Sequence, residues 1–195
     1  MFDARIEGRR LEFGVSGLLY QSDVLMYDRA TESLWSQLAF EAISGPLSGT
    51  ELEVVPATHT TWGDWRGSHP ETRVLSFQTG HIRDYDRDPY AGYAEVPGLY
   101  FPVSQRDDRY PAKSWVAGIV LGGQARAYPF SELARTGGDW VSDRIGKESL
   151  QIRFDPATRR VDARDARGQA LPVIPAFWFA WHAFYPEGTV FTSGP

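Results

Sequence analysis

The pattern that decides the fold occurs twice, as WGDWRGSHPE over residues 62–71 and as WFAWHAFYPE over residues 178–187. The two Trp residues, the Pro and the Glu keep their spacing, and matched residues lie 116 positions apart (178 − 62 and 187 − 71). Trp is rare in most proteins, so two matched pairs indicate an internal duplication rather than coincidence. The sequence therefore predicts two related halves with a pseudo-twofold relationship.

Each copy predicts a short helix, because its Trp residues are three apart and so share one helix face, and then a returning strand. The residues that cap or break the two helices are Thr60 or Thr61, Gly67 and Pro70 in the first copy, and Pro175 and Pro186 in the second. The returning strands are expected over residues 74–76 and 189–191. A helix-borne Trp pair that faces strands is expected in the core rather than on an exposed sugar-binding surface.

The remaining segments mostly favour β-structure. Hairpins are expected over residues 118–128 and 151–163, and further strands over 2–6, 11–15, 18–27 and 52–55. Thr31 is a typical helix N-cap and predicts a helix over Glu32–Phe40. We therefore expect an α+β fold, β-rich, with mostly antiparallel sheets and short helices.

A single domain over residues 1–195 suits this length and its 42% hydrophobic content. Its halves are expected over 1–76 and 115–195. Residues 77–114 are rich in Asp, Arg, Tyr and Pro and show little periodicity, which predicts a long irregular connection of the kind that is usually functional or a linker.

Composition excludes several classes of function. The net charge is −5, from 20 basic and 25 acidic residues, so no nucleic-acid partner is expected. The absence of Cys excludes disulfides, thiolate metal sites and a Cys nucleophile. No apolar run approaches the roughly 20 residues that span a bilayer, and the N-terminus lacks the apolar core of a signal peptide. As written, the chain is expected to be soluble and cytoplasmic, although composition does not fix its compartment.

An acidic loop is the first candidate site. Its carboxylates alternate with basic residues, and tyrosines lie nearby: Asp84, Tyr85, Asp86, Arg87, Asp88 and Tyr90, preceded by Arg83. Three carboxylates at alternate positions can surround a hard cation, as in calcium loops, but the Gly and the distal Glu of an EF-hand loop are not at the required spacing. The interleaved arginines equally favour a structural loop of self-neutralising ion pairs.

A second candidate cluster comprises Asp28, Arg29, Trp35 and Gln37. One large aromatic side chain with convergent polar groups suits a small-ligand pocket. The alternative is that Thr31 and its neighbours cap a helix while Trp35 packs in the core.

Nucleophile and metal motifs are weak. The four histidines are His59, His69, His81 and His182, and no two have the spacing of a helical zinc site. A composite site formed by His59 or His81 with Asp84 is a further hypothesis. Ser16 lies in a Gly-Val-Ser-Gly-Leu segment that lacks the final Gly of a nucleophile elbow. Catalytic residues, metal and cofactor therefore stay undetermined.

Several segments resemble the bacterial and archaeal domain-of-unknown-function family 3179. The matching segments follow one another in the family's order along nearly the whole chain. They are residues 13–20, 27–29, 31–37, 61–62, 83–90, 125–129 and 176–181. The resemblance implies no established activity. Longer members similar to this chain carry an upstream Ala-Tyr-Pro-like segment and a Cys-Pro-x-Cys-like motif that are missing here. A metal or redox role resting on those cysteines is therefore not expected, and the chain is expected to begin partway through its first repeat.

Together these patterns place the expected site near the junction of the halves, between residues 23–37 and the 83–93 loop. The leading hypothesis is binding of a small molecule or metal ion by an uncharacterised domain. One alternative is a hydrolase-like enzyme that uses the Asp84, Asp86 and Asp88 carboxylates with a His. Another is an interaction module of a larger assembly, with self-association through the incomplete first repeat and its exposed sheet edge.

Overall fold

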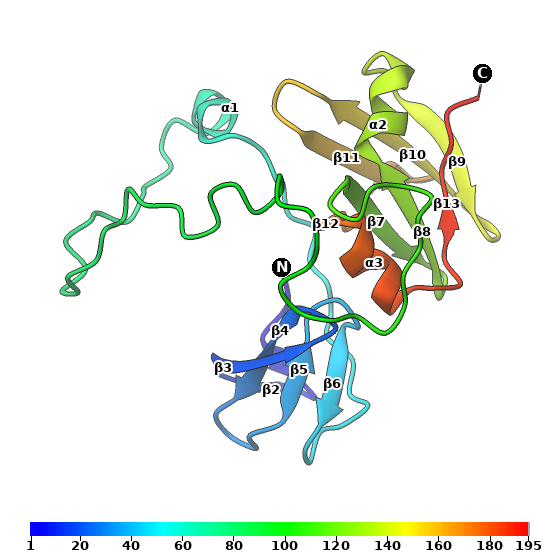
Figure 1. Ribbon diagram of the computed structural model, residues 1–195. Helices are drawn as coiled ribbons and strands as arrows, with labels where there is room; N and C mark the ends of the chain where they lie inside the picture. Colours follow the sequence, from blue (N-terminus) through cyan, green and yellow to red (C-terminus); the bar gives the residue numbers. More distant parts are fainter. Residues whose placement is uncertain (195) are drawn as a thin grey trace.

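The computed structural model describes residues 1–194 and contains two β-rich bodies (Figure 1). Residues 1–55 form the N-terminal body at the bottom of Figure 1, and residues 115–194 form the C-terminal body at the upper right. The connecting residues 56–114 contain one helix, α1 (Trp62–Ser68); their first part projects to the left in Figure 1, and the rest returns past α3 to β7. All strand pairings but one are antiparallel, so the predicted β-rich α+β class is confirmed.

The N-terminal body is built around a four-stranded antiparallel meander. Its strand order is β3-β4-β5-β6, beside a small hairpin of β1 and β2. The strands are β1 (Arg5–Ile6), β2 (Arg9–Arg10), β3 (Phe13–Tyr20), β4 (Asp23–Asp28), β5 (Leu34–Ser36) and β6 (Glu41–Ser44). The core of this body contains Ile6, Leu11, Trp35, Ala42 and Leu52.

The turn between β4 and β5 is organised by the buried carboxylate of Asp28. Asp28 Oδ1 accepts hydrogen bonds from the backbone amides of Ala30 and Thr31, at 3.0 and 2.6 Å. Asp28 Oδ2 accepts from the Thr31 hydroxyl at 2.7 Å and from the Trp35 indole N–H at 3.0 Å. The side chain therefore closes the turn, and the helix expected over Glu32–Phe40 was wrong: Thr31 caps a turn that leads into β5.

The C-terminal body packs two sheets face to face. The first has the order β12-β7-β8-β13 and the second β11-β10-β9. The elements are β7 (Trp115–Leu121), β8 (Gln124–Pro129), α2 (Phe130–Leu133), the 3₁₀ helix η1 (Ala134–Thr136), β9 (Val141–Ile145), β10 (Glu148–Asp155), β11 (Arg160–Asp165), β12 (Ile174–Phe177), α3 (Trp178–Phe184) and β13 (Thr189–Val190). The two predicted hairpins, β7–β8 and β10–β11, are confirmed.

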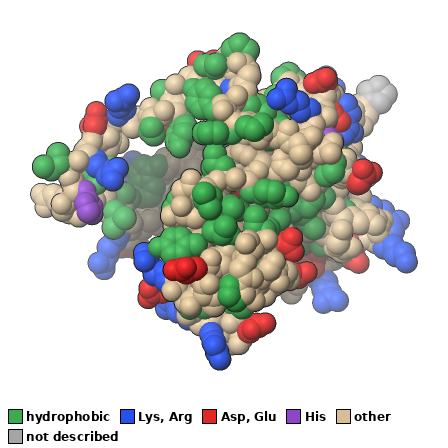
Figure 2. All heavy atoms as spheres, turned by 60° about the horizontal axis from the view of Figure 1, so that its bottom comes forward, with side chains coloured by type: hydrophobic (Ala, Val, Ile, Leu, Met, Phe, Trp, Pro, Cys, Tyr) green, Lys and Arg blue, Asp and Glu red, His purple; other side chains and the backbone are tan. Residues whose placement is uncertain are grey.

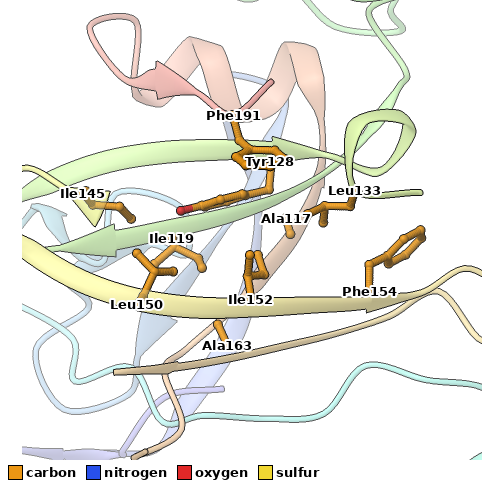
Figure 3. Close-up of a cluster of buried hydrophobic side chains, with 10 residues drawn as sticks. All are labelled: Ala117, Ile119, Tyr128, Leu133, Ile145, Leu150, Ile152, Phe154, Ala163 and Phe191. Atoms are coloured by element: carbon orange, nitrogen blue, oxygen red, sulfur yellow. The ribbon is translucent and has the colours of Figure 1, made fainter. Parts of the chain in front are cut away.

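The main core lies between these two sheets (Figure 3). Ala117 and Ile119 of β7 and Tyr128 of β8 face Leu150 and Ile152 of β10. The other face of the first sheet is covered by α3, whose Trp178 and Trp181 are each 1% exposed. Strand β7 is thus buried on both faces, which explains its continuous apolar sequence.

Helix α3 approaches β7 closely because β7 has a glycine beneath it. A Cβ atom at Gly118 would lie 2.0 Å from Cζ3 of Trp181, well inside contact distance. Gly118 therefore provides the space that the indole of Trp181 fills. This contact ties the second Trp-containing segment to its sheet.

The first Trp-containing segment forms a matching helix that has no sheet to pack on. Helix α1 has the same length as α3 at the expected offset, and both are preceded by an extended residue, with φ and ψ of −73° and 150° at Thr61 and −76° and 149° at Phe177. Each helix also brings together an aromatic pair four residues apart. Trp65 stacks on His69 with the ring centroids 3.9 Å apart, and Trp181 lies tilted against Tyr185 at 4.4 Å. However, α1 has no buried residue.

Several local predictions for the two segments were wrong. Trp62 is 47% exposed, so the first Trp pair is not part of a core. Residues 74–76 form no strand, because no partner strand lies beside them. Pro175 lies within β12, and α3 begins three residues later than expected. Residues 52–55 form no strand, and within them Val54 makes an isolated bridge with Phe2.

Substituting Gly118 with Ala should destabilise the C-terminal body by roughly 2–3 kcal/mol, because the new methyl group must displace the Trp181 ring. Chemical denaturation measures the change. The matched control is Gly63→Ala in α1, where a Cβ atom meets nothing within 4 Å. That change should be neutral or stabilise by up to about 1 kcal/mol. Equal effects of the two substitutions would contradict the proposed role of Gly118.

Substituting Asp28 with Ala should destabilise the N-terminal body by about 3 kcal/mol, because it leaves the buried Trp35 N–H and the turn amides without their acceptor. Urea unfolding followed by near-ultraviolet circular dichroism checks this. The control is Asp84→Ala in the exposed loop, which should change stability by less than about 0.5 kcal/mol. A stable Asp28→Ala protein would show that the turn does not depend on this carboxylate.

Candidate functional site

The two bodies meet through direct contacts between the N-terminal body and the end of α3. The Tyr185 hydroxyl donates a hydrogen bond of 2.6 Å to the Leu38 carbonyl oxygen. The ring of Tyr20 lies edge-on to Phe184 at 5.6 Å. Burial raises the pKa of Tyr185, and the nearby Glu41 adds to the rise. The phenol therefore stays protonated and acts as a donor across the junction.

A cavity of about 450 Å³ lies at this junction. Its wall combines the N-terminal body, the start of the connecting segment and the β12–α3 region: Met1, Phe2, Asp23, Gln37, Leu38, Ala57, Thr58, His59, Val173, Ile174, Pro175, Ala176, Phe177 and Ala180. Most of these side chains are apolar, and a few polar groups converge on them. That composition is typical of pockets that bind small molecules.

Asp23 is the acidic group of this wall and is only partly solvated. It begins β4, where it pairs with Tyr20 across the turn to β3. Its Oδ2 atom is buried and has no hydrogen-bond partner among the described residues. Burial raises the pKa of Asp23 to about 6, although the backbone amides of Val24 and Leu38 oppose the rise. The cavity thus contains a carboxyl group that changes charge near neutral pH.

Two further polar side chains line the same wall. Gln37 lies just after β5 and donates from Nε2 to the Val24 carbonyl oxygen at 3.0 Å, which fixes its amide beside β4. His59 belongs to the connecting segment and is exposed. Asp23, Gln37 and His59 therefore reach one cavity from three separate parts of the sequence.

The return half of the connecting segment is tied to both bodies near this cavity. Gln21 exchanges two hydrogen bonds with Ser104, at 2.7 and 2.8 Å. The ammonium group of Lys113 donates to the Tyr93 carbonyl at 2.6 Å and lies 3.7 Å from the centre of the Tyr93 ring. The Tyr93 ring lies 6.1 Å from Phe177, which lines the cavity. The segment is thereby anchored beside the junction from residue 93 onward.

The acidic loop lies away from the cavity, on the projecting segment at the left of Figures 1 and 2, where hydrophobic, acidic, basic and His side chains are mixed. Asp84 and Asp88 accept hydrogen bonds from the amides of Asp86 and Tyr90, at 3.2 and 2.8 Å, and so form local turns. None of the ion pairs within the described residues involves these three carboxylates, so the expected pairs with Arg83 and Arg87 do not form. Tyr85 stacks on Phe77 at 5.8 Å.

The structure also separates the members of the second candidate cluster. Asp28 and Trp35 are fully buried and hydrogen-bonded to each other. Burial alone raises the pKa of Asp28, but hydrogen bonds from Trp35, Thr31 and the backbone outweigh it and hold the pKa below its ordinary value. Arg29 is exposed, with its guanidinium 5.7 Å from the Tyr27 ring. Of the ten candidate residues of both clusters, Gln37 alone lines the junction cavity.

Sequence reasoning placed the site at the junction of the halves but did not single out Asp23. The available signal was an acidic residue inside an otherwise apolar, β-rich stretch, residues 18–27. A lone Asp there is equally typical of a turn, and Asp23 does follow one, with φ of 51° at Gln21 and 63° at Ser22. What makes this carboxylate unusual is its burial in the folded chain, which the local sequence does not reveal.

The described residues contain no group of three or more His, Cys, Asp or Glu side chains arranged to hold a metal ion. Within the same part of the chain, no helix has both the length and the apolar character required to cross a membrane. No curated protein and no solved structure gives a significant match to the chain. One family model does match, over residues 1–171, which is well above half of the sequence. The chain therefore belongs to the family described as "Protein of unknown function (DUF3179)".

Proposed function

We propose that this domain binds a small molecule in the junction cavity, with a cationic or hydrogen-donating group of the ligand placed at Asp23. The supporting observation is the buried Oδ2 atom of Asp23, which has no partner in the described chain. A buried acceptor that lacks a partner costs about 1–3 kcal/mol, and rotation of the carboxylate toward a ligand donor in the cavity would remove that cost. An apolar body of the ligand suits Phe2, Leu38 and Phe177.

The cavity size favours a compact ligand. A volume of about 450 Å³ lies within the range of small-molecule sites, roughly 300–1,000 Å³. The Gln37 amide, fixed by its bond to Val24, supplies a second polar contact that can orient the ligand. Binding a ligand at this place also bridges the two bodies and so stabilises their relative arrangement.

A hydrolase-like function is a second candidate, and one observation favours it. Asp23 and His59 line the same cavity, and a carboxyl group with a pKa of about 6 is suited to general acid–base catalysis near neutral pH. This pairing replaces the originally expected combination of the acidic loop with a His. Turnover of a substrate by the wild-type chain, lost in Asp23→Asn, would distinguish an enzyme from a binding domain.

We further propose that the chain contains two copies of one unit, in a single domain with halves 1–76 and 115–195 joined by residues 77–114. The support is the matched pair of helices, α1 and α3, with equal lengths, similar backbone angles at the preceding residue and an aromatic pair at the same positions. A role as an interaction module, with α1 as a contact surface, is compatible with ligand binding at the junction.

Benzylamine is a suitable probe, because it joins an ammonium group to a small apolar ring. Benzylamine should bind the full chain at pH 7.5, as measured by ligand-observed NMR. Benzoate, which has the opposite charge, should show no binding. Asp23→Asn should weaken benzylamine binding at least about tenfold, since it removes the charge that faces the ammonium group. The matched control is Asp108→Asn, a change at an exposed carboxylate, which should leave binding unchanged.

Equal binding by wild type and Asp23→Asn, or preference for benzoate, would contradict the assignment of Asp23 as the ligand contact. Because Asp23→Asn retains the size of the side chain, its circular dichroism spectrum should match that of the wild type. A folded variant with unchanged affinity therefore counts directly against the proposal.

The raised pKa of Asp23 also predicts how stability depends on pH. The carboxyl group ionises near pH 3.8 in the unfolded chain and near pH 6 in the folded one. Between these values the folded state holds the proton that the unfolded state has lost, so the contribution of Asp23 to stability falls as pH rises from about 4 to 6. Asp23→Asn should remove this part of the pH dependence. Urea titrations of both proteins from pH 4 to 7 measure it, and parallel curves would contradict it.

A further inference from the structure

The helix of the first Trp segment exposes side chains that its counterpart buries. No residue of α1 is buried, and Trp62 is 47% exposed, whereas Trp178 at the matching position of α3 is 1% exposed. Trp65 is held only locally, by the stack on His69 and by a hydrogen bond of 2.9 Å from its indole N–H to Thr72. Two large aromatic side chains are thus presented together on a short helix.

The residues after α1 are exposed in the same way. Val74 and Leu75 are 66% and 91% exposed. Their counterparts at the 116-residue offset are Val190 in β13 and Phe191, which is 7% exposed and lies 5.4 Å from the Tyr128 ring. The apolar residues of the whole segment 58–75 therefore lack the partner that segment 174–191 has.

Segment 174–191 packs on the β7–β8 hairpin and contacts both of its edges and one of its faces. Strand β12 pairs antiparallel with β7, and β13 pairs parallel with β8 through Thr189–Arg126 and Val190–Ala127. Helix α3 covers the face of the hairpin, with Trp181 above Gly118. The hairpin thus occupies the centre of a four-stranded sheet whose outer strands and covering helix all come from residues 174–190.

We infer that residues 58–75 are a docking site for a β-hairpin of the β7–β8 type, supplied by polypeptide outside residues 1–194. Residues 58–61 correspond to β12 and would pair antiparallel with one strand of the incoming hairpin. Residues 73–74 correspond to β13 and would pair parallel with the other strand. Addition of strands to exposed backbone is a common mode of peptide recognition, in which side-chain contacts give specificity.

The specificity of this site follows from α3. Trp181 lies so close to β7 that only Gly fits beneath it, so the incoming strand needs a glycine opposite Trp65. Small and β-branched residues, like Val116 and Ala127 beside α3, must flank that glycine. Burying the two indoles and the Val74 and Leu75 side chains provides the driving force, since each aromatic side chain buries about 150–250 Å².

A second copy of this chain is not the occupant. Its own β7–β8 hairpin is already covered by α3, with the space above Gly118 filled by Trp181 and both strand edges paired. Docking that hairpin on α1 would first require its release from the C-terminal core. The occupant is therefore a hairpin whose glycine face and edges are not covered.

The test joins a second copy of residues 113–130 to the full chain, before Met1, through a flexible Gly-Ser linker. Amide hydrogen exchange is measured for residues 62–75, with residues 141–165 of the β9–β11 sheet as an internal reference for intact folding. The joined hairpin should slow exchange of residues 62–75 at least about tenfold relative to the unmodified chain. Exchange in the reference strands should not change.

Two matched variants establish the contact. Replacing the glycine that copies Gly118 by Leu in the joined hairpin should abolish the slowing, and so should Trp65→Ala in α1. The inference is overturned if residues 62–75 exchange at the original rate while the reference strands remain protected, or if the Leu-bearing hairpin protects them equally. If exchange of residues 62–75 in the unmodified chain slows as the protein concentration rises, a second copy of the chain is the occupant. That result would also overturn the inference.

The readouts of the two proposals are separate, although Thr58 and His59 line the junction cavity and also belong to the docking segment. Benzylamine binding to the same proteins reports on Asp23, whereas exchange of residues 62–75 reports on α1 and the residues after it. Loss of one result therefore leaves the other standing.

Discussion

The close contact between Trp181 and Gly118 is the constraint on which the C-terminal body depends. Because Gly118 has no side chain, α3 can lie directly on β7 while the opposite face of the same sheet packs against β10. A strand buried on both faces organises the three layers of helix, sheet and sheet. The same placement of α3 brings Tyr185 to Leu38 and Phe184 to Tyr20, so this contact also sets the junction with the N-terminal body.

The junction cavity is a consequence of that arrangement. Asp23 lies at the start of β4 and lines this cavity together with residues of β12 and α3, and burial raises the pKa of its carboxyl group. The pKa rises because burial disfavours the charged form more strongly than the neighbouring amides favour it. In the N-terminal body Asp28 shows the opposite balance, since four hydrogen bonds hold its carboxylate ionised in spite of complete burial. Asp23 and Asp28 lie on the same strand, β4, yet their pKa values shift in opposite directions, because Asp28 accepts more hydrogen bonds.

The two Trp segments show how tertiary partners decide the fate of one local structure. Both fold into seven-residue helices with similar ends, because both segments have the same Trp-x-x-Trp spacing and a Pro at the same position after the helix. Only the second has a sheet to cover, and there its indoles are buried. The connecting residues after α1 contain no helix or strand as far as β7, which fits their polar, aperiodic sequence.

The sequence by itself determined the β-rich α+β class, the helices at both Trp segments, and the β7–β8 and β10–β11 hairpins. These features follow from local periodicity, turn residues and repeat spacing. The folded structure decided that Thr31 caps a turn rather than a helix, because its hydroxyl and amide donate to the Asp28 carboxylate, which also accepts from the buried Trp35 indole. It also decided that Trp62 is exposed, and that Asp23 rather than the acidic loop lines the cavity. Burial and the proximity of distant segments govern the exposure of Trp62 and the place of Asp23 in the cavity. The residues of a single segment do not determine either of these.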